Sequence, residues 1–102
     1  MAWFIKHETF TAETVALPLD QRRPQLEAHR AWVEQQGAAG RRIRSGFLVD
    51  EQQRPGGGGL LIFEAASYAE ALVWVQRDPM IQDGLVSWRL QQWIPVSRDG
   101  WP

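Results

Sequence analysis

Apolar residues recur along this chain with two different periods, and the order of these periods predicts the fold. Alternation of every second residue is typical of strands, whereas spacings of three and four residues are typical of helices. Strand-like patterns cover residues 2–7, 42–49, 60–65 and 86–94, and helical spacing covers residues 20–37 and 67–77. We therefore expect a ferredoxin-like βαββαβ domain of the α+β class, with two helices on one face of a four-stranded antiparallel sheet.

Particular residues mark the ends of the two predicted helices. Asp20 is the expected N-cap of the first helix, Pro24 falls in its first turn, and Gly37 ends it. Ser67 opens the second helix with a capping-box pattern. That helix must end near residue 77, because Pro79 disfavours helical geometry in the residue before it.

Three stretches are expected to lack regular structure. Residues 9–18 connect the first strand to the first helix, and residues 95–102 form a tail. Residues 50–59 are turn material that closes with four glycines, so we expect a hairpin with a long, mobile tip. Within the second strand, Gly46 is where a bulge or a close backbone approach is expected.

Composition limits the classes of protein to which this chain can belong. Its 102 residues form one domain, and 44% apolar and 23% charged residues are an ordinary globular balance. The absence of cysteine excludes a disulfide scaffold, a thiolate metal site and a cysteine nucleophile. A net charge of −1 gives no general attraction to nucleic acid or anionic lipid. Neither a membrane span nor a signal peptide is visible, so we expect a cytoplasmic protein.

Tryptophan is unusually frequent for a chain of this length. Six tryptophans are spread along the sequence at positions 3, 32, 74, 88, 93 and 101. Large side chains with a polar N–H suit both small cores and interfaces, and we favour these roles over stacking on a ligand. In the predicted fold one sheet face lacks helices, and a second copy of the chain is the simplest cover for it. We therefore expect a homodimer that encloses a shared cavity.

Four segments, residues 26–32, 45–48, 59–65 and 77–85, follow each other as in the YciI-like (YCII-related) family, which the chain resembles from its first strand to about Trp93. The resemblance implies a dimeric α/β-barrel-like fold with a His–Asp active site. The family histidine matches His29, the family aspartate matches Asp78, and the glycine of the family's second strand matches Gly46. The sequence departs from the family where Phe47 replaces a proline, and where the glycine run is longer than the turn usually needs.

His29 is the leading candidate for chemistry. It recurs at helical spacing with Leu26 and Val33, so it faces the sheet. An imidazole takes and gives a proton near neutral pH, and a nearby carboxylate such as Asp78 fixes its tautomer and favours its charged form. The alternative is a buried histidine bonded to a backbone carbonyl, with no reaction at all.

Other residues are candidates for binding a substrate. His7, Ser45 and Gly46 lie on predicted strands, and Arg89 projects from the last strand toward an anionic group or into solvent. His7 contacts a ligand if its face lines the dimer cavity, and otherwise lies in water at a strand end. The two histidines and scattered carboxylates show no metal-ligand spacing, so we expect no metal. The glycine run is not a phosphate loop, because no Gly-Lys-Ser/Thr and no helix follow it.

Two functions remain open from the sequence, with a third in reserve. The first is a cofactor-independent enzyme, a lyase or isomerase, in which His29 and Asp78 move a proton on a small ring or carbonyl compound by elimination, isomerisation or lactone chemistry, as the family resemblance suggests. The absence of a cofactor motif argues against hydride transfer. The second is a non-catalytic or regulatory dimer that captures a small-molecule ligand. The third is a structural domain that packs on another protein.

Overall fold

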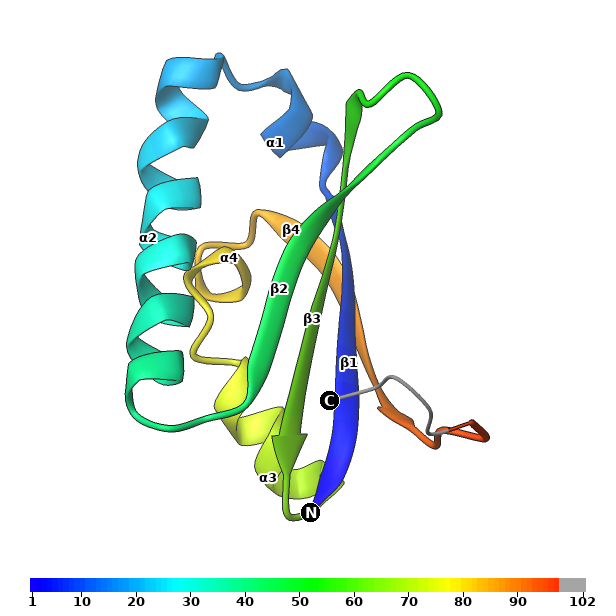
Figure 1. The fold of residues 1–102 in the computed structure, drawn as a ribbon. Helices are drawn as coiled ribbons and strands as arrows, with labels where there is room; N and C mark the ends of the chain where they lie inside the picture. The colour runs from blue at the N-terminus through cyan, green and yellow to red at the C-terminus, as the bar shows by residue number, and fades with distance from the viewer. Residues whose placement is uncertain (98–102) are drawn as a thin grey trace.

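The computed structural model describes residues 1–97 and contains the main elements in the predicted order (Figure 1). The strands are β1 (Ala2–Phe10), β2 (Ile43–Val49), β3 (Pro55–Ala65) and β4 (Val86–Trp93), and the helices are α1 (Ala12–Ala16), α2 (Leu19–Ala38), α3 (Tyr68–Val75) and α4 (Pro79–Gln82). All strand pairs are antiparallel, and the strand order is β2-β3-β1-β4. This is the ferredoxin-like topology, so the predicted fold class is confirmed.

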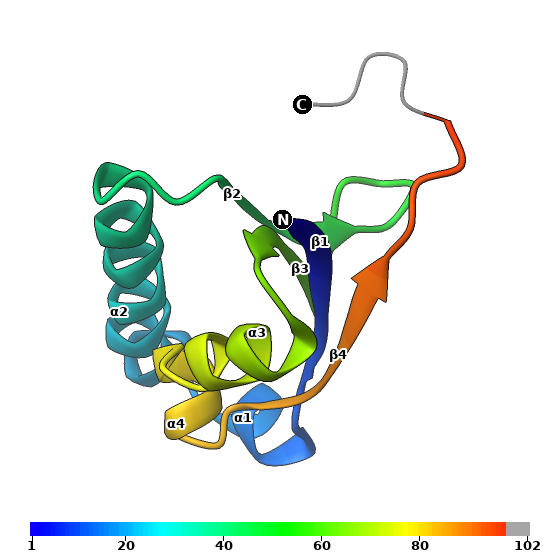
Figure 2. The same ribbon diagram turned by 90° about the horizontal axis from the view of Figure 1, so that it is seen from below.

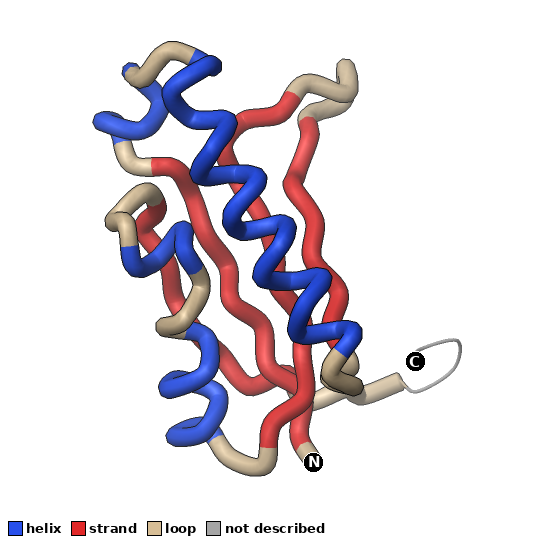
Figure 3. The backbone as a smooth tube through the Cα atoms, turned by 90° about the vertical axis from the view of Figure 1, so that its left-hand side faces the viewer, coloured by secondary structure: helices blue, strands red, loops and turns tan. Residues whose placement is uncertain are grey.

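The helices lie together on one side of the sheet, which Figure 3 shows from the front, and Figure 2 shows the other side without any helix. Apolar side chains from β1, β3, β4 and α3 form the buried core between these layers: Phe4, Leu61, Phe63, Ala65, Ala71, Trp74, Val75 and Leu90. The pattern of alternating burial along β3 shows why this face is closed, since every second residue from Gly59 to Ala65 is buried. Among the described residues, no helix has both the length and the apolar character needed to cross a membrane.

Three tryptophans, Trp32, Trp74 and Trp88, pack on the helix side of the sheet, whereas Trp3 and its cross-strand partner Trp93 lie on the other face. Trp74 is buried, and its ring centroid lies 4.3 Å from that of Phe63 and 4.8 Å from that of Trp32. Its indole N–H donates to Gln36 Oε1 at 2.8 Å, which satisfies the polar group of a buried ring. Trp88 also packs against the core. Trp101, which was counted with the others, lies outside the described residues.

The ends of α2 differ from those predicted. Pro18, in an extended conformation, precedes the first helical residue, so Asp20 lies within the first turn instead of capping it. Pro24 therefore falls inside the helix, beyond the first turn. Gly37 is also helical, because the residue that adopts the left-handed conformation is Gly40, with φ of 96°. The glycine that ends the helix is thus three positions later than predicted.

The predicted connector at residues 9–18 is structured. β1 continues to Phe10, and Thr11 then caps the short helix α1, where its hydroxyl accepts from the Thr14 amide at 3.2 Å. Thr14 is itself buried, and its hydroxyl donates to the carbonyl of Leu85 at 2.8 Å. This bond fastens α1 to the segment that leads into β4. A helix of one turn is too short to show a periodic pattern in the sequence.

The glycine run is part of β3, not of a long hairpin tip. The turn is confined to the residues between β2 and Pro55, where the Asp50 carboxylate accepts from the backbone amide of Arg54 at 3.0 Å. A Cβ on Gly59 would lie 3.1 Å from the carbonyl oxygen of Gly46 and 3.4 Å from Cγ of Glu8. Gly59 therefore lets the backbone of Gly46 approach and leaves room for the Glu8 side chain on the helix side of the sheet. Gly46 itself is not the crowded position, because a Cβ there would meet no atom within 4 Å, and the register shift of this strand pair lies between Phe47 and Val49.

Candidate active site

His29 lies midway along α2, on the face that covers the sheet. The half-buried residues of α2 recur three and four positions apart and define this face: Arg22, Gln25, Leu26, His29, Trp32, Val33 and Gln36. The spacing that predicted the orientation of His29 is thus the spacing that the helix uses for packing. The imidazole keeps 17% of its surface exposed, so it is positioned by its neighbours and still reachable from solvent.

Asp78 is brought to His29 by the corner between α3 and α4. Pro79 prevents α3 from continuing, and Asp78 adopts an extended conformation with φ of −60° and ψ of 124°. The same proline is the first residue of α4, and the Asp78 carboxylate caps that helix by accepting from the Met80 amide at 3.0 Å. A helix stop followed at once by a new helix start thus turns this carboxylate into the interior, where it is fully buried.

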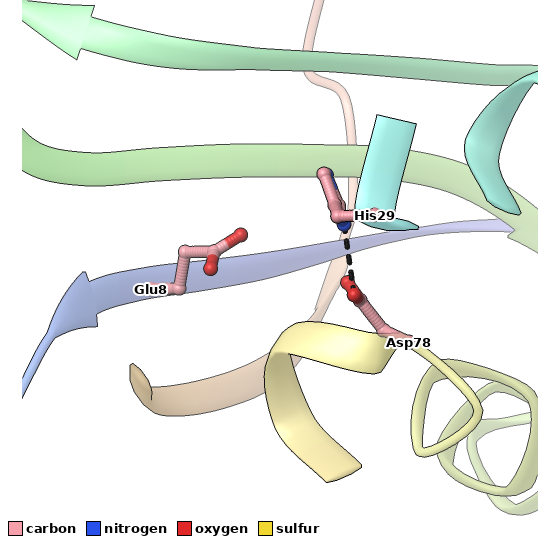
Figure 4. Close-up of side chains that lie close together, drawn as sticks. All are labelled: Glu8, His29 and Asp78. Carbon is pink, nitrogen blue, oxygen red and sulfur yellow. Dashed lines mark hydrogen bonds and ion pairs between the residues drawn. The ribbon is translucent and has the colours of Figure 1, made fainter. Parts of the chain in front are cut away.

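The imidazole and the carboxylate form a direct hydrogen bond. His29 Nδ1 lies 2.8 Å from Asp78 Oδ1, and the other ring nitrogen, Nε2, lies 3.3 Å from the hydroxyl of Ser45 (Figure 4 shows the first contact). An ionised carboxylate only accepts hydrogen bonds, so Nδ1 carries the proton of this bond. In the neutral ring Nε2 then has a lone pair, which is the arrangement of a general base with its orienting acid.

Two charged residues of β1, which the sequence did not single out, complete this cluster. The Nζ atom of Lys6 lies 2.6 Å from Asp78 Oδ2 and 2.8 Å from Glu8 Oε1. Lys6 is fully buried and Glu8 is 7% exposed. Both alternate with Phe4 on the helix side of the sheet. The sequence did contain a signal for these two residues, because both alternate with a core phenylalanine and so fall on the buried face of the strand. Charges that are buried in this way need partners.

The environment of Asp78 has opposing effects on its pKa. Burial alone would raise the pKa of the carboxyl group, because it penalises the charged form. The hydrogen bond from His29 and the positive charge of Lys6 act in the opposite direction and prevail, so the pKa of Asp78 is lowered from its usual value. The carboxylate is therefore ionised throughout the neutral range, as an acceptor for the imidazole N–H must be.

We expect Asp78 to make the fold sensitive to acid. A carboxyl group with a lowered pKa stabilises the folded state fully above its unfolded value of about 4, and this contribution is lost as the pH falls through the folded-state pKa. The difference in unfolding free energy between the wild type and Asp78→Asn should therefore shrink between about pH 5 and pH 2. Urea unfolding at several pH values measures it. A difference that is constant across this range contradicts the lowered pKa.

The same cluster is the only group of potential metal ligands found among residues 1–97. One donor atom each from Glu8, His29 and Asp78 lie within 4.8 Å of one another. This proximity in space was not visible as a spacing in the sequence. The ammonium group of Lys6, however, already lies between the two carboxylates, where it supplies the positive charge that a cation would bring. The donor set as it stands therefore favours proton chemistry over metal binding.

The remaining candidate residues fall on different faces of the sheet. Ser45 is paired with buried Leu61 and lies on the helix side with His29. Gly46, by contrast, is paired with Leu60, which is paired across β1 with His7, which in turn is paired with Arg89. These cross-strand partners form one row on the face without helices. His7, Gly46 and Arg89 therefore do not share a site with His29 within one chain, and His7 lies within β1, not at a strand end.

A shallow depression on the surface lies away from this cluster. It is bordered by the C-terminal end of α2 and the residues that follow, with Arg41, Arg42 and Glu64 among its lining residues. Arg42 and Glu64 are ion-paired across it at 3.0 Å, and the Arg41 guanidinium lies 4.4 Å from the Trp74 ring. Arg41 and Arg42 thus have partners within the chain.

Comparison with known proteins finds a family and a solved structure to which this chain is similar. Residues 2–93 match the sequence model of the YCII-related domain. Among solved structures, the chain is similar to the 5-chloro-2-hydroxyhydroquinone dehydrochlorinase TftG of Burkholderia phenoliruptrix AC1100, in complex with 2,5-dihydroxybenzoquinone. The TM-score is 0.66 at 24% sequence identity, and the match covers 90% of this chain and 93% of the other, which shows a shared fold. No curated protein sequence matches the chain.

Proposed function

The chain belongs to the YCII-related domain family, and from this premise we propose that it is a small cytoplasmic enzyme in which His29 transfers a proton on a small ring or carbonyl compound. The observation that carries the proposal is the bond between His29 Nδ1 and the buried Asp78 carboxylate, at 2.8 Å. Asp78 is a positioning residue in this scheme, and His29 is the catalytic one. The reaction class is elimination or isomerisation, without a cofactor.

The geometry gives each group a defined part. Asp78 is anchored on both oxygens, by Lys6 on Oδ2 and by His29 and the Met80 amide on Oδ1, so it does not rotate away from the ring. An imidazole held in this way presents Nε2 to a substrate and is stabilised when it takes up a proton. The Ser45 hydroxyl lies next to Nε2 in this structure, and a substrate atom takes that position during the reaction.

An aromatic side chain beside the cluster favours a planar substrate. Phe47, at the position where the family usually has proline, follows Ser45 on the helix side of the sheet and is 72% exposed. A ring this open offers a face on which a planar ligand stacks. The similar enzyme TftG is named for the removal of chloride from a hydroxylated ring and was solved with a hydroxylated quinone. We therefore place small hydroxylated rings first among the substrates to be tested.

Proton transfer can be detected even when the net reaction is unknown. We expect the purified protein to catalyse deuterium exchange or turnover with at least one compound from a set of hydroxylated quinones, 5-chloro-2-hydroxyhydroquinone and small lactones, followed by proton NMR in D₂O. Asp78→Asn should retain binding and lose most of the rate. Binding without exchange or turnover by the wild type supports a binding module instead and contradicts the enzyme.

We also propose that the chain forms a homodimer through the sheet face without helices. Trp3, Ile5 and Ile62 are cross-strand or diagonal neighbours on that face and are only half-buried within one chain. A contiguous apolar surface of this kind is stabilised by a second copy. Such a dimer would also give His7 and Arg89 a partner surface, and they remain proposed ligand contacts at that interface.

Light scattering at micromolar concentration tests the dimer. The wild type should have twice the mass of the chain, and Ile5→Lys should have the mass of one chain, because an ammonium group at the centre of the interface is desolvated without a partner. Val73→Lys is the control, since Val73 is exposed on α3, on the other side of the sheet. A monomeric wild type removes the proposal.

A further inference from the structure

Glu8 has one carboxylate oxygen in an ion pair and the other without any partner. Lys6 holds Oε1 at 2.8 Å, whereas Oε2 is buried and makes no hydrogen bond within the described structure. The residue as a whole is 7% exposed. An ionised oxygen that is removed from water and left without a donor destabilises the folded state. A proton on Glu8, or a donor placed beside it, removes this cost.

The charges of the cluster also require one more proton. Lys6 contributes one positive charge, and Asp78 and Glu8 contribute two negative charges when both are ionised. Among residues 1–97, the only other titratable group that forms a hydrogen bond or ion pair with them is His29. Arg22, on the same face of α2 two turns before His29, forms no hydrogen bond or ion pair with these groups in the described part of the chain, and its Nε atom has no partner. The buried cluster is thus neutral when a single extra proton is on either His29 or Glu8.

We propose that Glu8 is the second proton-carrying residue of this site and exchanges that proton with His29 through the substrate. The proposal rests on the proposed function and adds the acid to its base. A ring nitrogen of His29 and a Glu8 oxygen lie within 4.8 Å of each other. The ligand that fits is a small carbonyl compound whose oxygen accepts from the Glu8 carboxyl group and whose adjacent carbon carries a hydrogen that faces His29 Nε2, because Nδ1 is already bonded to Asp78.

The step conserves protons and electrons. Neutral His29 removes a proton from carbon, the C–H electron pair forms a C=C bond, and the π electrons of the adjacent carbonyl take the proton of the Glu8 carboxyl group. The product is an enol, with His29 as imidazolium and Glu8 as carboxylate. When the imidazolium and the enol hydroxyl then give their protons to atoms other than those from which the protons came, the product is an isomer of the substrate. The cluster remains neutral throughout, so no charge is created in the interior.

Nuclear magnetic resonance tests this pairing without a substrate. The chain has two histidines, so His7, on the other sheet face, is an internal reference for His29. In Glu8→Gln, the His29 imidazole should release its proton at a pH lower by at least about half a unit, the size of a single-charge interaction across 4.8 Å even in water. The His7 signal should not move. Glu64→Gln, which removes a strand carboxylate paired with Arg42, is the matched control.

Two further measurements test the role of Glu8. In the wild type, the side-chain carboxyl ¹³C signal of Glu8 should respond over the pH range in which His29 titrates, which requires no variant. With a substrate from the D₂O assay, Glu8→Gln should lower kcat by about 10²-fold, and Glu64→Gln should not. An unmoved His29 signal in Glu8→Gln, or a silent Glu8 carboxyl signal in the wild type, overturns the role of Glu8 while leaving the proposed function intact. Absence of exchange by the wild type overturns the proposed function and, with it, proton exchange through the substrate, whereas the two signals in the protein without substrate still report whether Glu8 and His29 share a proton.

Discussion

His29→Ala is expected to lower the rate of proton transfer by about 10²- to 10⁴-fold, the usual contribution of a positioned general base. The variant loses the imidazole that Asp78 orients, and the second histidine, His7, lies on the other face of the sheet. Steady-state kinetics with a substrate found in the D₂O assay measure the effect. The loss should appear in kcat, because His29 acts on the bond that reacts.

The fold of this variant should survive. Asp78 keeps its ion pair with Lys6 and its bond from the Met80 amide, so the carboxylate is not left alone in the interior. We expect the unfolding free energy to fall by no more than about 2 kcal/mol. Arg30→Ala, the next residue of α2 on its solvent side, is the matched control and should leave the rate unchanged. Full activity of a folded His29→Ala protein ends the catalytic assignment.

Lys6→Met is expected to destabilise the protein by about 3–5 kcal/mol, the cost of leaving buried charges without their partner. Methionine preserves most of the volume and removes the ammonium group that contacts both Asp78 and Glu8. The two carboxylates then face each other in the interior with only His29 to offset them. Urea unfolding at neutral pH gives the change in unfolding free energy.

A double variant and a surface variant sharpen this measurement. Lys6→Met/Glu8→Gln removes one charge of each sign and should be more stable than Lys6→Met alone, because Asp78 then faces His29 without a second carboxylate. The side chains of Arg30 and Glu34 form an ion pair and are 82% and 70% exposed, respectively. Arg30→Met breaks this pair and should lower the unfolding free energy by at most about 1 kcal/mol. An equally small cost for Lys6→Met would show that the cluster is more hydrated than its burial indicates.

The order of the main elements was predictable because their apolar periods are long and clear. The stripe of α2 places His29 over the sheet, and the alternation in β4 places Val86 and Leu90 on the buried face. The short helices α1 and α4 were missed, since one turn of helix has no period to detect. Pro79 was interpreted correctly as the end of α3, but its second role as the first residue of α4 was not anticipated.

The extent of β3 was underestimated for a different reason. Glycine has no side chain, so the residues from Gly56 to Gly59 show neither alternation nor polarity, and their turn propensity decided the prediction. In the structure Gly58 and Gly59 pair with β1 and Gly59 also pairs with β2, and the absence of Cβ atoms makes room for Glu8 and for Phe10. The tertiary contacts, not the local propensity, set the start of the strand.

The candidate site was only partly accessible from the sequence. No spacing links His29 to Asp78, which are 49 positions apart, and the pair entered through the family resemblance. Lys6 and Glu8 were passed over because a charged residue on a strand is usually exposed. Their burial depends on partners from a distant corner of the fold. The other candidates could not be assigned to a sheet face together with His29 from the sequence, and the pairing register places His7, Gly46 and Arg89 on the opposite face.

The central claim is that Asp78 holds the proton of His29 on Nδ1 and leaves Nε2 as the base. Nitrogen-15 NMR of the two imidazoles, at a pH where His29 is neutral, measures this directly, because protonated and bare ring nitrogens have different chemical shifts. The arrangement of these side chains predicts a protonated Nδ1 and a bare Nε2 for His29. A proton on Nε2 with a bare Nδ1, or an equal mixture of the two tautomers, would contradict it.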